Sequence, residues 1–389
     1  MNSLLLVSND KIFIAKFSNR LNHDAYELAI SSSLEEAKIE LAQKDYRMVL
    51  VDLSEEAENE VLLRFLKLKY PKVIRLAVMN ASTSMDYYMP KQQNSAQMSW
   101  KKNIDNEELF IIIDKVIAID AQVKNSELVN LVSNFKHLPT VPEIYNQLSL
   151  LIQENASVEE IALKLEEDPA VTSNILKMAN SAFYNAKTGS IRQAIMYIGL
   201  INVKNIILTN AVFGNDGLPP ETRQIHWEHV SLTNKILNGM YQELLGKKLN
   251  NNISSVGLLH DIGSIVLMSN FPKEFKKIVE IVNCQEGTNI NAVEKEWIGF
   301  NHEELGGHLL DLWGLPFPII EAALYHHEPF SEKVINKELV ISMHVANYYA
   351  WKFMNINHYQ QSLDVKAFSE LGITQKMFDV FFENLKRKL

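Results

Sequence analysis

The stretch MVLVDL at residues 48–53 is an apolar run that ends beside an acid, a pattern typical of a strand buried on both faces of a parallel sheet. Similar runs precede and follow it, and segments with apolar residues three and four positions apart alternate with them. The strand-like runs are SLLLV (3–7), YELAIS (26–31), MVLVDL (48–53), VIRLAVM (73–79) and a weaker one near 96–100. The first 115 or so residues therefore predict a doubly wound α/β domain with five strands.

The apolar spacing changes to a helical period at about Ser126 and keeps that period to the end of the chain. Helix starts are marked by capping residues such as Ser157 and by Pro139, Pro142 and Pro169. No Gly- or Ser-rich linker separates the two halves, so we expect a helix to join them. The sequence thus predicts an all-α second part with a core of its own.

Bulk properties argue against several classes of protein. The chain has 389 residues, a formal net charge of −9 and no dense Lys/Arg run, which disfavours binding to nucleic acid. The N-terminal apolar run has only four residues and no later segment approaches the length of a membrane span, so we expect a cytoplasmic protein without a membrane partner. Its one cysteine, Cys284, agrees with a reducing compartment, and we expect it to be buried.

The order of the strands and the positions of the acids make residues 1–118 resemble the receiver domain of bacterial response regulators. Receivers are phosphorylated on an aspartate at the end of the third strand, the place of Asp52 here. The lysine at the end of their fifth strand matches Lys102. The resemblance implies a switch domain, and it also leads us to expect a homodimer through this domain.

Other receiver positions depart from the family. The two acids that hold Mg²⁺ after the first strand are replaced by Ser8 and Asn9, and Asp10 is the nearest acid. Receivers have a hydroxyl residue after the fourth strand, and Met79 stands at that position here. Its thioether cannot donate a hydrogen bond to a phosphoryl group. We therefore expect a degenerate site that is not phosphorylated, with its lysine solvated or paired with the strand-end aspartate. That site consists of Asp10, Asp52 and Lys102.

The helical part resembles the HDOD family, the HD-related output domain of bacterial signalling proteins. Several motifs occur in the order of the family, namely Leu138-Pro139, Asp168-Pro169, NSAFY at 180–184, GLLHDIGSIVL at 257–267 and ALYHHEP at 323–329. The predicted domains are accordingly a degenerate receiver-like domain at 1–118, a helical linker at 119–130 and an HDOD domain at 131–389.

The HD superfamily holds one or two metal ions with histidines and aspartates from different helices, and such a metal activates water for attack on a phosphoester. Carried over by position, the implied ligands are His229, His260, Asp261, His302, His326 and His327. Two acids of the family are replaced. Asn347, which offers a neutral carbonyl oxygen, stands at the position of the closing aspartate, and Ile225 stands where two-metal members have an acid one helical turn before the first histidine. We assign no definite cofactor, and the resemblance implies that the histidine cluster could hold a divalent metal ion, Fe, Mn, Mg or Zn.

Two hypotheses of function stay open. The first is a non-enzymatic signal-transduction protein, whose HDOD domain binds a protein or nucleotide partner under control of the receiver-like domain. The second is a metal-dependent phosphohydrolase or phosphodiesterase that acts on a nucleotide. Asn347 and Ile225 favour the first, because both replace an acid that metal binding and water activation would use. We therefore assign no catalytic residue.

Other conspicuous side chains are interpreted as structural. His226, His308 and His344 match no ligand position of the family. We expect Met178, Met196 and Met240 in the core of the helical part.

Overall fold

The computed structural model describes residues 2–53, 58–79, 96–102, 106–139, 141–154, 156–180, 186–213, 218–250, 253–284, 288–356 and 362–387. The chain divides into two compact units, Met1–Ala121 and Gln122–Leu389. One helix, α5 (Asn106–Val123), runs across the boundary between them. The domain limits expected at residues 118 and 131, with a linker at 119–130, remain predictions.

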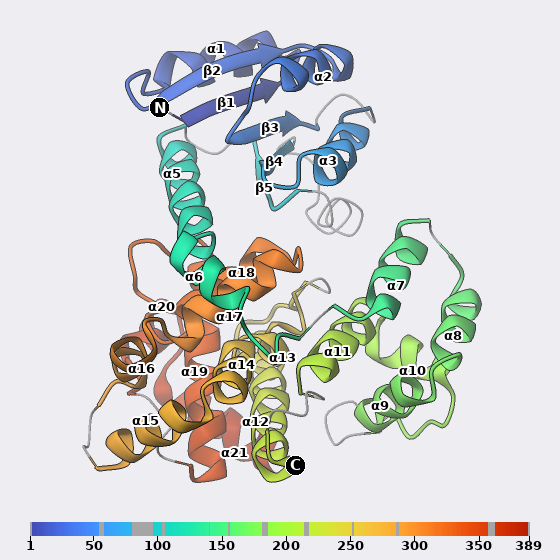
Figure 1. The fold of residues 1–389 in the computed structure, drawn as a ribbon, viewed down its shortest axis with the longest axis vertical. Coiled ribbons are helices and arrows are strands. Elements are labelled where there is room, and N and C mark those ends of the chain that lie inside the picture. Colours follow the sequence, from blue (N-terminus) through green and yellow to red (C-terminus); the bar gives the residue numbers. More distant parts are fainter. Residues whose placement is uncertain are drawn as a thin grey trace. The chain divides into compact units, whose positions relative to one another are not determined.

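The first unit contains a sheet of five parallel strands in the order β2-β1-β3-β4-β5 (Figure 1). The strands are β1 (Asn2–Val7), β2 (Tyr26–Ser31), β3 (Met48–Asp52), β4 (Ile74–Met79) and β5 (Met98–Lys101). This order is that of flavodoxin-like folds, in which a crevice forms beyond the carboxyl ends of β1 and β3. The sheet confirms the predicted α/β fold class.

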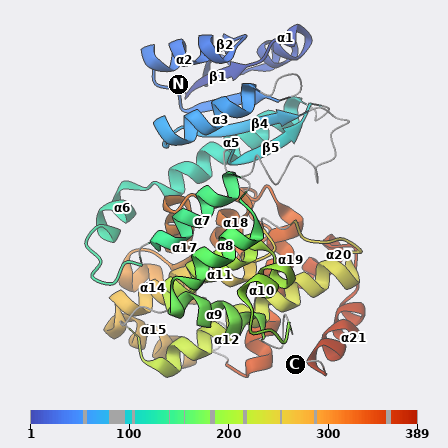
Figure 2. The same ribbon diagram turned by 90° about the vertical axis from the view of Figure 1, so that its right-hand side faces the viewer.

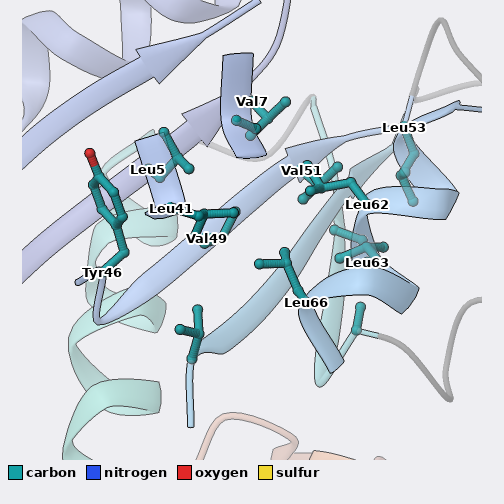
Figure 3. Close-up of a cluster of buried hydrophobic side chains, with 14 residues drawn as sticks. Leu5, Val7, Leu41, Tyr46, Val49, Val51, Leu53, Leu62, Leu63 and Leu66 are labelled. Carbon is teal, nitrogen blue, oxygen red and sulfur yellow. The ribbon is translucent and has the colours of Figure 1, made fainter. Parts of the chain in front are cut away.

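Helices cover both faces of this sheet. On one face, α2 (Leu34–Gln43) contacts β1 and β2, and α3 (Glu58–Lys69) contacts β3 and β4. On the other, α1 (Lys11–Arg20) packs on α5 through Phe17 and Phe110, whose ring centroids lie 4.9 Å apart. Successive side chains of a strand point to opposite faces. Leu5 and Val7 of β1 therefore join the core beneath α2 and α3 (Figure 3).

Burial on both faces explains why the strands read as continuous apolar runs. Every residue of β3 and of β4 is buried. A central strand covered by helices on both sides has no solvent-facing positions, so its sequence does not alternate between apolar and polar residues. The run MVLVDL is thus a central strand, as its composition predicts.

The helices are the only regular secondary structure among the described residues of the second unit, which confirms the predicted all-α part. Helices α8, α9 and α10 pack together (Figures 1 and 2), α12 lies along α19, and α17 contacts both α14 and α18. The helices are α6 (Ser126–Val132), α7 (Glu143–Gln153), α8 (Val158–Glu166), α9 (Pro169–Ala179), α10 (Ile191–Ile198), α11 (Leu200–Phe213), α12 (Pro220–Gly239), the π-helix η1 (Met240–Leu244), α13 (Val256–Leu259), α14 (Ile262–Asn270), α15 (Pro272–Cys284), α16 (Ile290–Ile298), α17 (His302–Leu312), α18 (Phe317–Tyr325), α19 (Lys337–Met354), α20 (Lys366–Glu370) and α21 (Gln375–Lys386).

Local sequence fixes where several of these helices begin. Ser157 forms a capping box with Glu160 at the start of α8, and Asn301 forms one with Glu304 at the start of α17. Asp168 caps α9 directly before a proline in the first turn. The cap at Asn301 matters for function because the next residue, His302, is one of the predicted ligands.

Two predictions about buried side chains are wrong. Cys284 is exposed at the end of the amphipathic helix α15. Met196 is 69% exposed because α10 buries its opposite face. Met178 and Met240 are buried, as predicted.

In the described part of the chain, no single helix has both the length and the apolar character needed to cross a membrane. Helices α10 and α11 meet these two criteria only as a pair, and they are bent by 105° relative to each other.

Candidate functional site

The predicted receiver-like site lies at the carboxyl ends of β1, β3 and β5. The Nζ atom of Lys102 is 2.8 Å from Oδ2 of Asp10 and 2.8 Å from Oδ2 of Asp52. The hydroxyl of Ser8 donates a hydrogen bond of 2.6 Å to the Asp52 carboxylate. The structure thus brings the three predicted residues together and adds Ser8 to them.

Lys102 forms ion pairs with both carboxylates of this site. Its hydrogen bond lowers the pKa of Asp10, which also accepts bonds of 3.0 Å from the backbone N–H groups of Ile12 and Phe13. Burial lowers the pKa of Lys102, but the hydrogen bonds to the two carboxylates outweigh burial and raise the pKa overall. The ammonium group therefore stands between acids that in a working receiver would face a divalent cation. Met79 is buried at the end of β4 and supplies no hydroxyl.

The predicted metal ligands of the second unit come from several helix ends. All of them are buried except the half-buried His327. They are His229 on α12, His260 at the end of α13, Asp261 between α13 and α14, His302 at the start of α17, and His326 and His327 just after α18.

Two glycines let these helices approach one another closely enough to bring the ligands together. A Cβ atom on Gly257 of α13 would lie 2.5 Å from the Cα atom of Asn234 on α12. A Cβ atom on Gly263 of α14 would lie 2.0 Å from the carbonyl oxygen of His302. Any larger residue would push the helices apart. The motif GLLHDIGS therefore places the HD pair against both α12 and α17.

The six side chains form two groups. One contains His229, His260 and Asp261, and the other contains His302, His326 and His327; in each group, one ligand atom from every residue lies within 4.8 Å of the others. The Asp261 carboxylate joins the groups, because Oδ2 is 4.0 Å from Nε2 of His229 and Oδ1 is 4.0 Å from Nε2 of His302. Asp261 thus lies where a carboxylate can bind metal in either group.

Three of the histidines are oriented by a hydrogen-bond acceptor that contacts Nδ1 of the ring. With the proton placed on Nδ1 by that acceptor, Nε2 keeps the lone pair that a metal ion needs. The buried Nε2 of His326 has no hydrogen-bond partner among the described residues. The acceptors are the carbonyl oxygen of Gly257 for His260 (2.9 Å), that of Ala323 for His326 (2.9 Å) and the Glu294 carboxylate for His302 (2.7 Å).

Asn347 of α19, which the family resemblance matches to the closing aspartate, contacts His260. Its Oδ1 atom is 3.1 Å from Nε2 of His260. Both atoms are acceptors when the His260 proton is on Nδ1, and their separation is close to that between neighbouring ligands of one metal ion. Without a cation the amide can turn and donate from Nδ2. The donor set of the first group, two imidazoles, a carboxylate and an amide oxygen, fits a divalent transition metal.

The electrostatics favour neutral imidazoles at most positions. Burial, with the neighbouring histidines, lowers the pKa of His229, His326 and His327 well below its usual value. Burial also opposes protonation of His302, but Glu294 and the other nearby acids outweigh it and raise the pKa of His302 to about 9. A neutral imidazole is the form that binds metal. His302 would have to lose a proton when it becomes a ligand.

Several residues that shape the site carried no signal in the sequence. Trp351 stacks on His229 with a centroid separation of 3.7 Å, and Glu294 orients His302. Glu303 is buried, and burial raises its pKa to about 8. These contacts join residues on different helices, so no local spacing reveals them. The sequence shows only that Glu303 directly follows the predicted ligand His302, and this adjacency alone does not reveal its burial.

The three unmatched histidines belong to neither group of candidate ligands. His344 donates from Nδ1 to the carbonyl oxygen of His326 at 2.8 Å, and His308 donates to that of Val123 at 2.6 Å. His226 lies edge-on to Trp351. Ile225 is half-buried on α12 and adds no acid to the site.

The fold and the cluster together define a class of protein, a receiver-like α/β domain followed by an all-helical HD-type domain. More specifically, residues 138–329 match the model of the HDOD domain family, so the chain contains an HDOD domain. The sequence is 23% identical over 233 residues to an uncharacterized protein of Treponema pallidum (strain Nichols). That match covers 59% of this chain but only 45% of the curated relative.

Solved structures share the fold. An HDOD domain protein of unknown function from Geobacter sulfurreducens is 26% identical, with a TM-score of 0.51, and the match covers 63% of this chain and 81% of that one. A candidate signal transduction protein from Marinobacter aquaeolei VT8 is 16% identical, with a TM-score of 0.52, over 92% of this chain and 86% of that one. The second likeness extends over both units and shows the fold alone.

Proposed function

We propose that the protein is a signalling regulator whose HDOD domain binds a divalent metal ion and recognises a protein or nucleotide partner without hydrolysing a substrate. The observation that carries this proposal is Asn347, whose neutral amide oxygen lies beside His260 where the HD superfamily has an aspartate. When bound, the metal would act as a Lewis acid. The residues of this chain determine how strong that Lewis acid is.

The charge of the ligands supports binding without efficient turnover. Asp261 contributes the single carboxylate of the six predicted ligands, and the five histidines bind as neutral groups. One divalent ion at these ligands leaves a net charge of about +1, whereas two leave about +3 in a buried site, which is costly. The charge of the ligands therefore favours one ion. It also leaves the site one negative charge short at Asn347 compared with an aspartate there.

The receiver-like domain enters the same proposal as a regulator that does not depend on phosphorylation. Its strand-end aspartate, Asp52, already accepts a hydrogen bond from Ser8 and forms an ion pair with Lys102. We infer that this domain acts through contacts with other proteins, including a second copy of the chain. That the HDOD domain has a protein or nucleotide partner is likewise part of the proposal.

A metal-dependent phosphohydrolase is the second candidate. The observation that favours it is the carboxylate of Asp261, which lies 4.0 Å from a histidine of each group and so between two possible metal positions. Both candidate functions require a bound metal ion, but only the phosphohydrolase would turn over a substrate.

Turnover assays separate the two candidates. Cyclic dinucleotides and guanosine tetraphosphate-type nucleotides would be incubated with the native protein and Mn²⁺, Fe²⁺ or Mg²⁺, and with His260→Ala and Asn347→Asp. We expect no turnover by the native protein and a gain of activity in Asn347→Asp, because an anionic ligand is restored. Turnover by the native protein that disappears in His260→Ala would overturn the non-enzymatic proposal.

A further inference from the structure

An open pocket of about 530 Å³ adjoins the second histidine group. The turn after α18 and the segment before α20 form its walls, and His344 of α19 also lines it. His327 is the member of the metal cluster that faces this pocket. The pocket therefore leads from solvent to a ligand of the candidate metal site.

Burial within the histidine group falls off toward this pocket. His302 and His326 are 3% and 0% exposed, whereas His327 is half-buried. The His327 ring centroid lies 4.1 Å from that of His326 and 5.1 Å from that of His302. An ion that binds His327 is thus within reach of two more imidazoles, including the buried Nε2 of His326 that lacks a hydrogen-bond partner among the described residues.

The lining of the pocket carries negative charge. Glu328 and Asp364 line it, and no lysine or arginine does so within the described ranges. His344 is held as part of the wall, since it donates to the carbonyl oxygen of His326 at 2.8 Å and accepts from the backbone N–H of Asp364 at 3.1 Å. A recess lined by one sign of charge concentrates counter-ions and speeds their binding. This recess attracts cations and repels phosphates.

We propose that this pocket is the access route of the divalent cation, in which Glu328 and Asp364 attract the ion and His327 binds it first. The inference rests on the metal binding in the proposed function. It adds that the acids act on the rate of association and are not ligands of the bound ion. In a phosphohydrolase the site would have to admit a phosphate, which an acidic pocket repels. A route for a cation explains why the pocket is acidic.

Stopped-flow absorbance with Co²⁺ tests this role in the full chain. The probe is the visible spectrum of Co²⁺, which changes when histidines replace water, and the variant is Glu328→Gln with Asp364→Asn. Asparagine keeps the acceptor that Asp364 offers to the backbone N–H of Lys366 at the start of α20. We expect association to slow by roughly three- to tenfold at low ionic strength. The difference should vanish at about 0.5 M salt, where screening is strong, and the dissociation rate should stay unchanged.

Glu280→Gln with Glu296→Gln is the matched control, because it removes two exposed acids from α15 and α16, which do not line the pocket. It should associate as fast as the native protein. If the pocket variant also bound Co²⁺ as fast as the native protein, the proposed access route would be wrong, but the proposed metal site would be unaffected. Faster dissociation at an unchanged association rate would make the acids ligands and contradict the proposal. A native protein that binds no Co²⁺ would overturn the proposed function as well.

Discussion

At the scale of single residues, Lys102 takes over in this receiver-like domain the neutralising role that a divalent cation has in a working receiver. It pairs with Asp10 and Asp52 at 2.8 Å each, and Ser8 donates to the second of these acids. Phosphorylation would have to break these contacts and place further negative charge in a site that offers no hydroxyl at Met79. Each part of this interpretation can be tested with one change.

Incubation with acetyl phosphate and Mg²⁺ should leave the intact mass of the protein unchanged. The reason is that Asp52 is buried and already engaged by an ammonium group and a hydroxyl. Mass spectrometry of the native protein and of Asp52→Ala makes the comparison. A gain of one phosphoryl group in the native protein that is absent from the variant would refute the claim.

Replacing Lys102 by methionine should destabilise the first unit by about 3 kcal/mol, because two carboxylates lose their shared cation. Millimolar Mg²⁺ should restore part of that loss, since two nearby carboxylates offer the oxygen ligands that this ion prefers. Urea unfolding with and without Mg²⁺ measures both effects. The matched control is Lys72→Met in the exposed turn before β4, which should change stability little. A Lys102 variant as stable as the native protein would contradict the account.

At the scale of secondary structure, the HD pair is positioned by close helix contacts. The four-residue helix α13 ends directly before His260, and the glycines on either side of the HD pair allow close contact with α12 and α17. The sequence predicted the strands and helices well because their signals are local periods and caps. Trp351 and Glu294 could not be predicted as parts of the site, because they reach it through contacts between different helices, which no local period or cap reveals.

Gly263→Ala should destabilise the second unit by about 3 kcal/mol and weaken metal binding, because its Cβ would lie 2.0 Å from the carbonyl oxygen of His302. Thermal unfolding and a Co²⁺ titration report the two effects separately. Gly189→Ala serves as the control, since a Cβ there meets no atom within 4 Å. Equal stability and equal affinity of the two variants would show that this helix contact does not hold the site together.

At the scale of the whole molecule, the chain divides into two compact units, and the candidate metal site lies in the second. A fragment Gln122–Leu389 keeps the hydrogen bond of 3.0 Å from Tyr325 to Gln122 and that from His308 to Val123. We expect it to fold alone with an almost wholly helical circular dichroism spectrum. Substantial strand signal, or failure to unfold cooperatively, would show that the unit depends on the first 121 residues.

The most direct test of the central claim is calorimetric titration of the metal-free full chain with Mn²⁺ or Co²⁺. The account predicts about one ion per chain, at least a hundredfold loss of affinity in His260→Ala, and a tenfold to hundredfold loss in Glu294→Gln, which leaves His302 without its orienting carboxylate. Native protein that binds neither ion, or a His260→Ala variant that binds as tightly as the native protein, would contradict the assignment of the histidine cluster as a metal site.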